Sequence, residues 1–309
     1  MKDAFVNICN VPTHIYTKGR WIEESLDNEK EIAICITGNP GVPGFYTEFI
    51  EELYQRLECK MPVWVIGHMG HDDPPATSIR EVPQLKGNEE LFDLNAQIRH
   101  KIEFIKKYIP QDCKIHLIGH SIGAWMILQM LENDYIRQAV IKCYMLFPTV
   151  ERMIESQNGW VFTKIALPMY WIFGFLIVLF NRLPVFIRMC FIHLYFLLSA
   201  IPSHFRGAAL CYSKASVVEK VIFLAEDEMA RVRFLQTNII EQNLNLLTFY
   251  YGTTDGWVPV EYFNGLKKEF PEIDAQLDTK KIDHAFVLRY SKPMGGIVSN
   301  MIVQNSTLF

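Results

Sequence analysis

The chain has 309 residues, of which half are hydrophobic and 21% are charged, with 17 Gly and 15 Pro along it. This composition excludes a disordered, collagen-like or coiled-coil protein and predicts one large core that carries an insertion. The 30 Lys and Arg against 34 Asp and Glu give a formal net charge of −4 and form no basic stripe. Because phosphate binding requires such a stripe, nucleic acid is not predicted as a partner.

Seven cysteines, an odd number, include no Cys-x-x-Cys pair and no cysteine–histidine spacing typical of zinc. We therefore predict reduced core thiols in a cytosolic compartment and no metal site. No glycine-rich phosphate loop follows the first strands, so no cofactor is predicted. The first residues contain no apolar run of signal-peptide length, and secretion is not expected.

Short apolar runs alternate with segments of helical spacing through most of the chain. Residues 4–9 and 13–20 are predicted to form an opening hairpin. This alternation predicts a mostly parallel central sheet with helices on both faces. The further predicted strands are 31–37, 63–66, 114–119, 141–147, 244–251 and 275–282, and the first three of these precede predicted helices at 45–57, 88–108 and 121–131.

A segment of about ninety residues interrupts this pattern. We predict a core formed by residues 1–150 and 241–309, with residues 151–240 inserted as a cap. Between residues 156 and 218 there is no Asp or Glu, whereas this stretch contains five cations, Lys164, Arg182, Arg188, Arg206 and Lys214. It also contains two uncharged apolar runs of 17 residues each, at 165–181 and 189–205. We predict that these runs form an apolar hairpin over about 160–206.

Three interpretations of the hairpin differ in what covers its apolar surface. Each run is shorter than the ~20 residues that a spanning helix needs, and prolines interrupt them. A lid of buried helices over the active site is possible, but the outer face of such a lid would need charges. We therefore favour a monotopic hairpin in a lipid interface, with cations facing anionic headgroups and aromatic side chains at the boundary.

The run Gly119-His-Ser-Ile-Gly123 follows an apolar strand and precedes a helix, which is the setting of a nucleophile elbow. In this sharp turn the central Ser121 takes up a strained backbone conformation, and side chains at Gly119 and Gly123 would collide with neighbouring backbone. The helix N-terminus behind Ser121 supplies N–H groups to a developing oxyanion. The alternative is a chance motif in an ordinary turn.

A catalytic serine needs a histidine base and an acid that orients it. Asp255 follows the predicted strand 244–251, and His284 follows the predicted strand 275–282. Each alone is explained equally well as a surface turn residue. The chain order Ser, Asp, His, with each residue placed after a strand, is nevertheless the order of the α/β-hydrolase triad. We predict Ser121, Asp255 and His284 as catalytic residues.

An oxyanion hole needs a second backbone donor beside the N–H of Ile122. The turn at residues 38–41 ends an early strand, and because Pro40 has no N–H, Asn39 is the candidate donor, although a plain turn explains these residues equally well. His68, His71 and Asp73 could suggest a metal site or an acyltransferase-like pattern. We favour loop residues that shape the pocket entrance. His116 and His120 are not predicted to be catalytic.

Four motifs together resemble the lipid droplet-associated hydrolase family of the α/β-hydrolase superfamily: the turn at 38–41, the elbow at 119–123, and the runs 250–259 and 283–286. The match spans nearly the whole chain. The resemblance implies an α/β-hydrolase fold and a serine hydrolase with Ser121, Asp255 and His284 in the triad positions. In the wider superfamily a His-Gly pair often stands at the position of Thr37-Gly38.

The resemblance also implies a cellular setting. It implies the cytosolic face of lipid droplets and of the endoplasmic reticulum, reached through the apolar hairpin, and a role in cholesterol and triglyceride homeostasis. The implied substrates are neutral lipid esters, with weak sterol ester hydrolysis as the activity. Two alternatives stay open. One is a lipid-droplet scaffold with a residual hydrolase site, and the other is acyl transfer by the same triad, which differs in water access to the acyl-enzyme.

Overall fold

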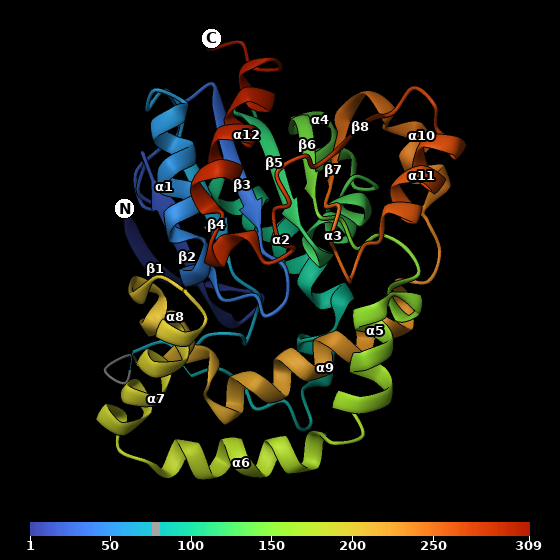
Figure 1. Cartoon of the computed structure of the whole chain (residues 1–309). Helices are drawn as coiled ribbons and strands as arrows, with labels where there is room; N and C mark the ends of the chain where they lie inside the picture. The colour runs from blue at the N-terminus through green and yellow to red at the C-terminus, as the bar shows by residue number, and fades with distance from the viewer. Residues whose placement is uncertain (76–80) are drawn as a thin grey trace.

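One sheet organises the molecule. In this computed structural model, which describes residues 1–75 and 81–309, eight strands pair in the order β1-β2-β4-β3-β5-β6-β7-β8 (Figure 1). Strands β3 to β8 run parallel to one another, whereas the hairpin β1-β2 joins β4 in an antiparallel sense. The mostly parallel sheet predicted from the sequence is confirmed. The strands are β1 (Lys2–Ile8), β2 (Val11–Lys18), β3 (Glu31–Ile36), β4 (Val63–Ile66), β5 (Lys114–His120), β6 (Val140–Leu146), β7 (Leu247–Tyr251) and β8 (Asp274–Leu277).

Helices cover both faces of the sheet, and this explains why its central strands β3, β4 and β5 are almost entirely buried. In β3, Ile32, Ile34 and Ile36 join the core on one face. Ala33 and Cys35 join the core on the other, as the two-residue period of a strand requires. The helices are α1 (Thr47–Arg56), α2 (Leu94–Tyr108), α3 (Ile122–Met130), α4 (Asp134–Ala139), α5 (Gln157–Val161), α6 (Tyr170–Arg182), α7 (Val185–Leu198), α8 (Arg206–Tyr212), α9 (Ala215–Arg231), α10 (Thr237–Gln242), α11 (Val260–Glu269) and α12 (Ser291–Val303).

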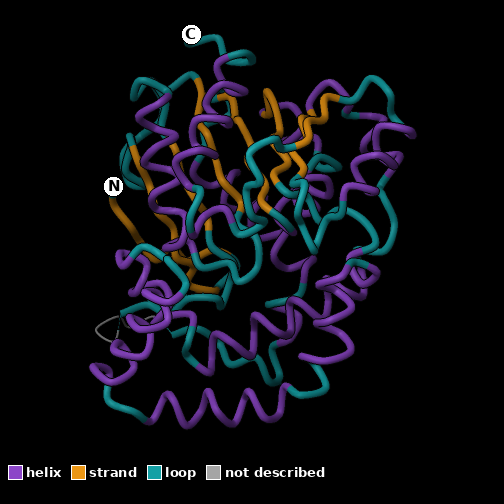
Figure 2. The backbone as a smooth tube through the Cα atoms, in the orientation of Figure 1, coloured by secondary structure: helices purple, strands orange, loops and turns teal. Residues whose placement is uncertain are grey.

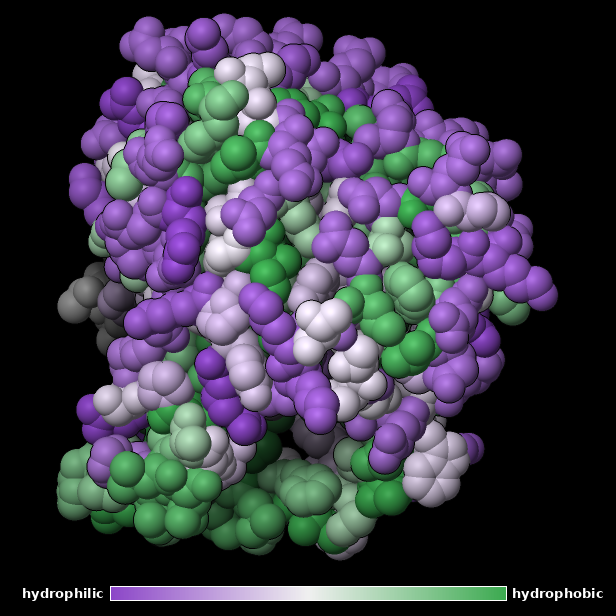
Figure 3. All heavy atoms as spheres, turned by 45° about the horizontal axis from the view of Figure 1, so that its top comes forward, coloured by the Kyte–Doolittle hydropathy of each residue, from purple (hydrophilic) through white to green (hydrophobic). Residues whose placement is uncertain are grey.

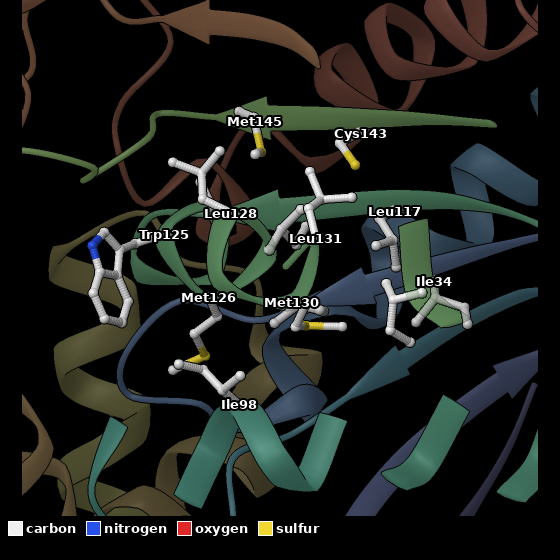
Figure 4. Close-up of a cluster of buried hydrophobic side chains, with 14 of the residues drawn as sticks. Ile34, Ile98, Leu117, Trp125, Met126, Leu128, Met130, Leu131, Cys143 and Met145 are labelled. Carbon is white, nitrogen blue, oxygen red and sulfur yellow. The ribbon is translucent and has the colours of Figure 1, made fainter. Parts of the chain in front are cut away.

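The helix that follows β5 is apolar all round because it lies between two layers. Met126 of α3 points towards Ile98 of α2, whereas Leu128 and Leu131 point towards the sheet residues Met145 and Cys143 (Figure 4). Eight of the nine residues of α3 are buried. This packing fixes the start of α3, and with it the turn that holds Ser121, against the sheet.

The C-terminal strand is shorter and less buried than predicted. β8 covers only Asp274–Leu277, at the sheet edge, with exposed and half-buried residues in alternation. The prediction of a buried strand over 275–282 is wrong, because the chain turns at Asp278. The Asp278 carboxylate accepts hydrogen bonds from Tyr250 Oη at 2.6 Å and from Ile282 N at 2.8 Å. His284 therefore lies in a loop, several residues beyond the strand.

Two smaller predictions also need correction. The second predicted helix begins at Leu94 and not at residue 88, because the Asp93 side chain accepts a hydrogen bond from Ala96 N at 2.7 Å and caps the helix there. The prediction that the cysteines are core thiols is wrong for most of them. Cys35, Cys113 and Cys143 are buried, Cys211 is half-buried, and Cys9, Cys59 and Cys190 are exposed.

Residues 151–240, which we call the cap segment, contain helices α5 to α9 and the start of α10, and α5 to α9 lie beyond the carboxyl ends of the strands (Figure 1). Loops from the sheet fill the layer between the strands and these helices (Figure 2). α6 packs against α9, and α7 packs against α8. The two apolar helices therefore meet at a corner, with the rings of Phe180 and Phe191 6.3 Å apart.

The surface of this corner is apolar. α6 contains no buried residue, and α7 buries only Ile192 and Phe196. Side chains of this kind gather at the base of the molecule, whereas the surface over the sheet layers is mainly polar (Figure 3). No single helix among the described residues has the length and apolarity to cross a membrane. The bent pair Gln157–Ala166 and Tyr170–Arg182, which meets at 78°, passes that test by length and composition together.

Candidate active site

Ser121 stands between β5 and α3 in the conformation of a nucleophile elbow. Its φ of 55° and ψ of −122° are unusual for a residue with a side chain and store strain in the turn. The two flanking glycines are required by close packing. A Cβ at Gly119 would lie 2.8 Å from the backbone of Ala124, and one at Gly123 would lie 2.5 Å from the carbonyl oxygen of Ile36.

The three residues predicted as a triad lie within hydrogen-bond distance of one another. Ser121 Oγ lies 2.9 Å from His284 Nε2, and His284 Nδ1 lies 2.6 Å from Asp255 Oδ2. Because a carboxylate can only accept, Nδ1 carries the proton and Nε2 is left to accept from the serine hydroxyl. This arrangement is able to take a proton from Ser121 and to stabilise the imidazolium that results.

Asp255 is held by the turn that follows β7. Its Oδ1 accepts hydrogen bonds from the backbone N–H groups of Trp257 at 2.7 Å and Val258 at 3.1 Å. The side chain has no exposed surface. These two donors leave Oδ2 directed at His284, so the Asp-Gly-Trp-Val sequence at 255–258 supplies both the acid and its support.

Of the three backbone N–H groups in the turn at 38–41, two already donate to partners within the protein. Gly38 N donates to Tyr46 Oη at 2.8 Å, and Gly41 N donates to Gly38 O at 2.7 Å. Pro40 has no N–H. The backbone N–H of Asn39 has no partner among the described residues, and Asn39 lines the same cavity as Ser121. Ile122, at the first position of α3, has the unpaired N–H of a helix N-terminus.

A buried relay of hydrogen bonds joins this turn to the loop of His284. His120 Nε2 lies 2.8 Å from the backbone carbonyl of His284, to which it must donate, so its Nδ1 accepts from Tyr46 Oη at 2.6 Å. Burial lowers the pKa of His120 to about 3, with the nearby His284 acting in the same direction. Burial likewise raises the pKa of Tyr46 well above its usual value. Both side chains are therefore neutral near pH 7 and hold fixed hydrogen-bonding roles.

A cavity of about 710 Å³ opens in front of Ser121. Its wall is formed by the sheet loops on one side and by cap-segment side chains on the other, among them Phe162, Phe180, Phe191 and Phe196. Aromatic and aliphatic groups dominate, and the polar groups of the wall include Asn39, His120 and His284 beside Ser121. This distribution suits a ligand that is mostly apolar and carries one reactive polar group.

The histidines after β4 do not lie where the sequence predicts. His68 and His71 are buried, and neither belongs to the cavity wall, so their predicted place at the pocket entrance is wrong. His71 Nδ1 donates to the carbonyl of Pro40 at 2.7 Å. This bond supports the turn at 38–41, which we call the oxyanion turn after its predicted role. Asp73 instead forms an ion pair with Lys214 of the cap segment at 3.2 Å. No group of three or more metal-ligating side chains occurs within the described part of the chain.

Sequence reasoning missed three residues around the site. Tyr46 accepts from Gly38 N and donates to the ring of His120. His120 in turn donates to a backbone carbonyl that is distant in the chain, although its position beside Ser121 was a usable signal. Glu228 of α9 is a buried carboxyl group in the cavity wall. The apolar stripe of Val221 and Leu224 continues to Glu228 with helical spacing, so an acid on an otherwise buried face could have been noticed.

Several known proteins are similar to this chain over nearly its whole length. A family model described as lipid-droplet associated hydrolase matches residues 29–287. The lipid droplet-associated hydrolase of Drosophila melanogaster is 67% identical over 306 residues, which cover 99% of each chain. That of Mus musculus is 34% identical and covers 98% of this chain and 95% of its own.

Solved structures with low sequence identity share the fold. A thioesterase domain from the curacin biosynthetic pathway has a TM-score of 0.62 at 11% identity and covers 96% of this chain and 99% of that domain. The Bacillus megaterium epoxide hydrolase has a TM-score of 0.61 at 14% identity, with 97% and 99% covered. These likenesses show an α/β-hydrolase fold, and the matches along the sequence show that the chain belongs to the lipid droplet-associated hydrolase family.

Proposed function

We propose that this protein hydrolyses carboxylic esters of neutral lipids at the surface of lipid droplets, with Ser121 as the nucleophile. One observation carries the proposal. The linked side chains of Ser121, His284 and Asp255 lie at an apolar cavity whose outer wall belongs to the helices with the exposed apolar surface. An ester dissolved in lipid is the substrate that fits both features.

In the first half-reaction, the Ser121 oxygen attacks the ester carbonyl carbon while its proton passes to His284 Nε2. Asp255 stays ionised and stabilises the imidazolium. The carbonyl oxygen becomes an oxyanion that accepts hydrogen bonds from the N–H groups of Ile122 and Asn39. When the carbon–oxygen bond to the alcohol breaks, His284 gives its proton to the leaving oxygen, and an acyl-enzyme is left on Ser121.

In the second half-reaction, water replaces the alcohol. His284 takes a proton from the water as its oxygen attacks the acyl carbon, and the collapsing intermediate releases the carboxylic acid and returns the proton to Ser121. No redox step or cofactor is needed. If another alcohol took the place of water, the product would be a new ester, and product analysis distinguishes this acyl transfer from hydrolysis.

Sterol esters are the proposed substrates within this class, and the family resemblance is what singles them out. A sterol ester is apolar apart from its ester group, and most of the side chains that line the cavity are aliphatic or aromatic. Hydrolysis of such esters would lower the amount of stored cholesterol. Because the same droplets store triglyceride, the amount of triglyceride would change as well. The name of the relatives, lipid droplet-associated hydrolase, supports the lipid droplet as the place where the substrate is met.

The exposed apolar side chains support the proposed location on the cytosolic face of droplets and of the endoplasmic reticulum. Of the 22 large apolar side chains that are exposed among the described residues, 18 lie between residues 160 and 212. They include Trp171 at 74% and Leu198 at 80% exposure. A patch of this extent is costly in water and is stabilised in a lipid interface. The cations of the same stretch, such as Arg182, suit contact with anionic headgroups.

The test of the enzyme uses a fluorophosphonate probe, which reports an activated serine without requiring the substrate. We expect the wild-type protein to be labelled, the Ser121→Ala variant to be unlabelled, and the surface variant Ser203→Ala to be labelled as wild type. Wild-type protein should then release fatty acid from cholesteryl oleate in an emulsion. Absence of labelling in all three proteins would favour a scaffold without catalysis, as would full restoration of cellular lipid storage by Ser121→Ala.

The test of the location uses flotation with phospholipid-coated triolein droplets. Replacing both Trp171 and Leu198 by Asp should reduce the floating fraction at least tenfold, because each substitution places a charge in the lipid boundary. The matched control replaces Val303 and Phe309, exposed apolar residues outside the cap segment, by Asp. Equal flotation of both double variants would contradict the proposed interface.

A further inference from the structure

A buried carboxyl group of the cap segment lies in the wall of the active-site cavity. Glu228, in the last two turns of α9, is 1% exposed and faces the same cavity as Ser121. Burial raises the pKa of Glu228 to about 8, although its hydrogen bond with Asn39 acts in the opposite direction. The group is therefore mostly protonated at neutral pH. A buried acid that forms no ion pair needs an explanation, because its removal from water is costly.

The partner of Glu228 is the residue that we propose as an oxyanion donor. Asn39 Nδ2 donates to Glu228 Oε1 at 3.0 Å and to the backbone carbonyl of Val221 at 3.1 Å. Both acceptors belong to α9, two turns of helix apart. The side-chain amide of Asn39 therefore has both of its hydrogens committed to the cap segment, while its backbone N–H has no partner among the described residues.

The core holds the residues on both sides of Asn39. Gly38 is fixed through Tyr46, and Pro40 is fixed through the hydrogen bond from His71 Nδ1 to its carbonyl. The peptide that carries the Asn39 N–H is oriented from within the turn by the hydrogen bond from Gly41 N to Gly38 O, and the Asn39 side chain adds an anchor from the cap segment. An oxyanion donor acts only when it is aimed at the place where charge develops, and a small displacement is enough to lower the rate.

We propose that Glu228 is a positioning residue that fixes Asn39, so that a helix of the cap segment completes the oxyanion hole formed by the core. The inference deepens the proposed function and rests on it, since the hole has a role only if Ser121 attacks an acyl group. Glu228 has no direct contact with Ser121 in this scheme. Its neutral form also avoids a negative charge beside the developing oxyanion, which an ionised carboxylate would repel.

Three substitutions separate positioning from packing. Glu228→Gln keeps an oxygen that accepts from Asn39 Nδ2, Glu228→Met keeps the volume without the acceptor, and Glu228→Ala removes both. Glu226→Ala is the matched control, because Glu226 lies on the same helix with its side chain exposed. Each protein is assayed with p-nitrophenyl butyrate, a small soluble ester, so that lipid binding does not enter the measurement.

We expect kcat to fall 10- to 100-fold in the Met and Ala variants, with KM within twofold of wild type, because the lost donor stabilises the transition state more than the bound ester. The Gln variant should keep kcat within threefold, and Glu226→Ala should match wild type. Melting temperature is measured for all variants. If Glu228→Ala fails to fold, the comparison of the Met and Gln variants decides.

The outcomes distinguish this inference from the proposed function. A Met variant with wild-type kcat would overturn the positioning role, as would a Gln variant as slow as Met. In both cases fluorophosphonate labelling of wild-type Ser121 would leave the proposed hydrolase intact. If wild-type protein is neither labelled nor active, the proposed function fails, and the positioning role fails with it.

Discussion

His120 Nε2 lies 2.8 Å from the backbone carbonyl of His284, so the residue that precedes Ser121 supports the loop that holds the proposed base. The same imidazole accepts from Tyr46, whose oxygen accepts from the N–H of Gly38. One chain of three hydrogen bonds therefore connects the oxyanion turn, the elbow and the His284 loop. Because these groups are buried, the position of the His284 loop and that of the turn at 38–41 depend on one another.

Removing the hydroxyl of Tyr46 should disturb both ends of this chain. In Tyr46→Phe the N–H of Gly38 loses its acceptor and His120 loses its donor, and each buried group left unpaired costs about 1–3 kcal/mol. We expect the melting temperature to fall by several degrees and kcat to fall about tenfold. The assay is p-nitrophenyl butyrate hydrolysis, with Tyr108→Phe at the end of α2 as control. A variant with unchanged kcat would show that the relay does not position His284.

Replacing Asp255 tests whether this carboxylate orients His284 as the proposed base. In Asp255→Asn the amide can donate to His284 Nδ1, which favours the tautomer that presents a proton, and not a lone pair, to Ser121. We expect kcat to fall about 10³- to 10⁴-fold with little change in stability, as in other serine triads. Asp274→Asn, which changes a carboxylate that accepts from Thr248 at the sheet edge, should have wild-type kcat. A loss below tenfold in Asp255→Asn would indicate another base.

Local sequence predicts the elbow well because its determinants are neighbours. The apolar strand β5, the two glycines and the apolar helix α3 lie within seventeen consecutive residues. The loop of His284 depends instead on Asp278, whose carboxylate is held by Tyr250 of another strand. A run of suitable residues at 275–282 resembles a strand, but only its first three residues, with Asp274 before them, pair with β7. The residues of the run do not themselves indicate where strand pairing with β7 ends.

In the cap segment, too, the sequence predicts the helices but not how they pack. Its apolar composition predicts helices with an uncovered surface, and α6 and α7 have that surface. The two helices meet at a corner because α6 packs against α9 and α7 packs against α8. Hydrophobic periodicity predicts which face of a helix is apolar, but not which helix will cover it. The burial of His68 beneath the oxyanion turn and the pairing of Glu228 with Asn39 are likewise contacts between distant segments, where single-sequence reasoning has no signal.

Glu31 gives a prediction for stability in acid. Burial alone would raise the pKa of its carboxyl group, but hydrogen bonds from His116, Ser306 and Thr307 reverse the sign and lower this pKa from 4.5 to about 2. Since the unfolded chain takes up a proton near pH 4.5, the stabilisation is complete above that pH and is lost as the pH falls towards 2.

The measurement is the free energy of unfolding of wild type and Glu31→Gln between pH 7 and pH 2.5. We expect the variant to be less stable at pH 7 by an amount on the order of 2 kcal/mol. This difference should shrink as the pH falls from 4.5, because wild type alone loses the contribution. A difference that is constant over this range would mean that the carboxylate and its partners in the C-terminal segment do not act as one unit.

Glu228 predicts the opposite dependence on pH. Its pKa in the folded protein is raised from 4.5 to about 8, chiefly by burial, with the neighbouring Asp227 acting in the same direction. Between these two values the unfolded chain loses this proton and the folded protein keeps it. The carboxyl group therefore destabilises the fold increasingly as the pH rises from 4.5 to 8, and adds nothing further above 8.

Glu228→Gln removes this titration while keeping the acceptor for Asn39, and Asp227 remains paired with Arg231 at 2.6 Å. The Gln variant should match wild type near pH 5 and exceed its free energy of unfolding by an amount on the order of 2–4 kcal/mol at pH 8. Urea unfolding at pH 5, 6, 7, 8 and 9 measures the difference, which should grow and then level off. If the difference stays flat from pH 5 to 8, Glu228 is ionised in the folded protein, and a negative charge then lies beside the oxyanion turn at neutral pH.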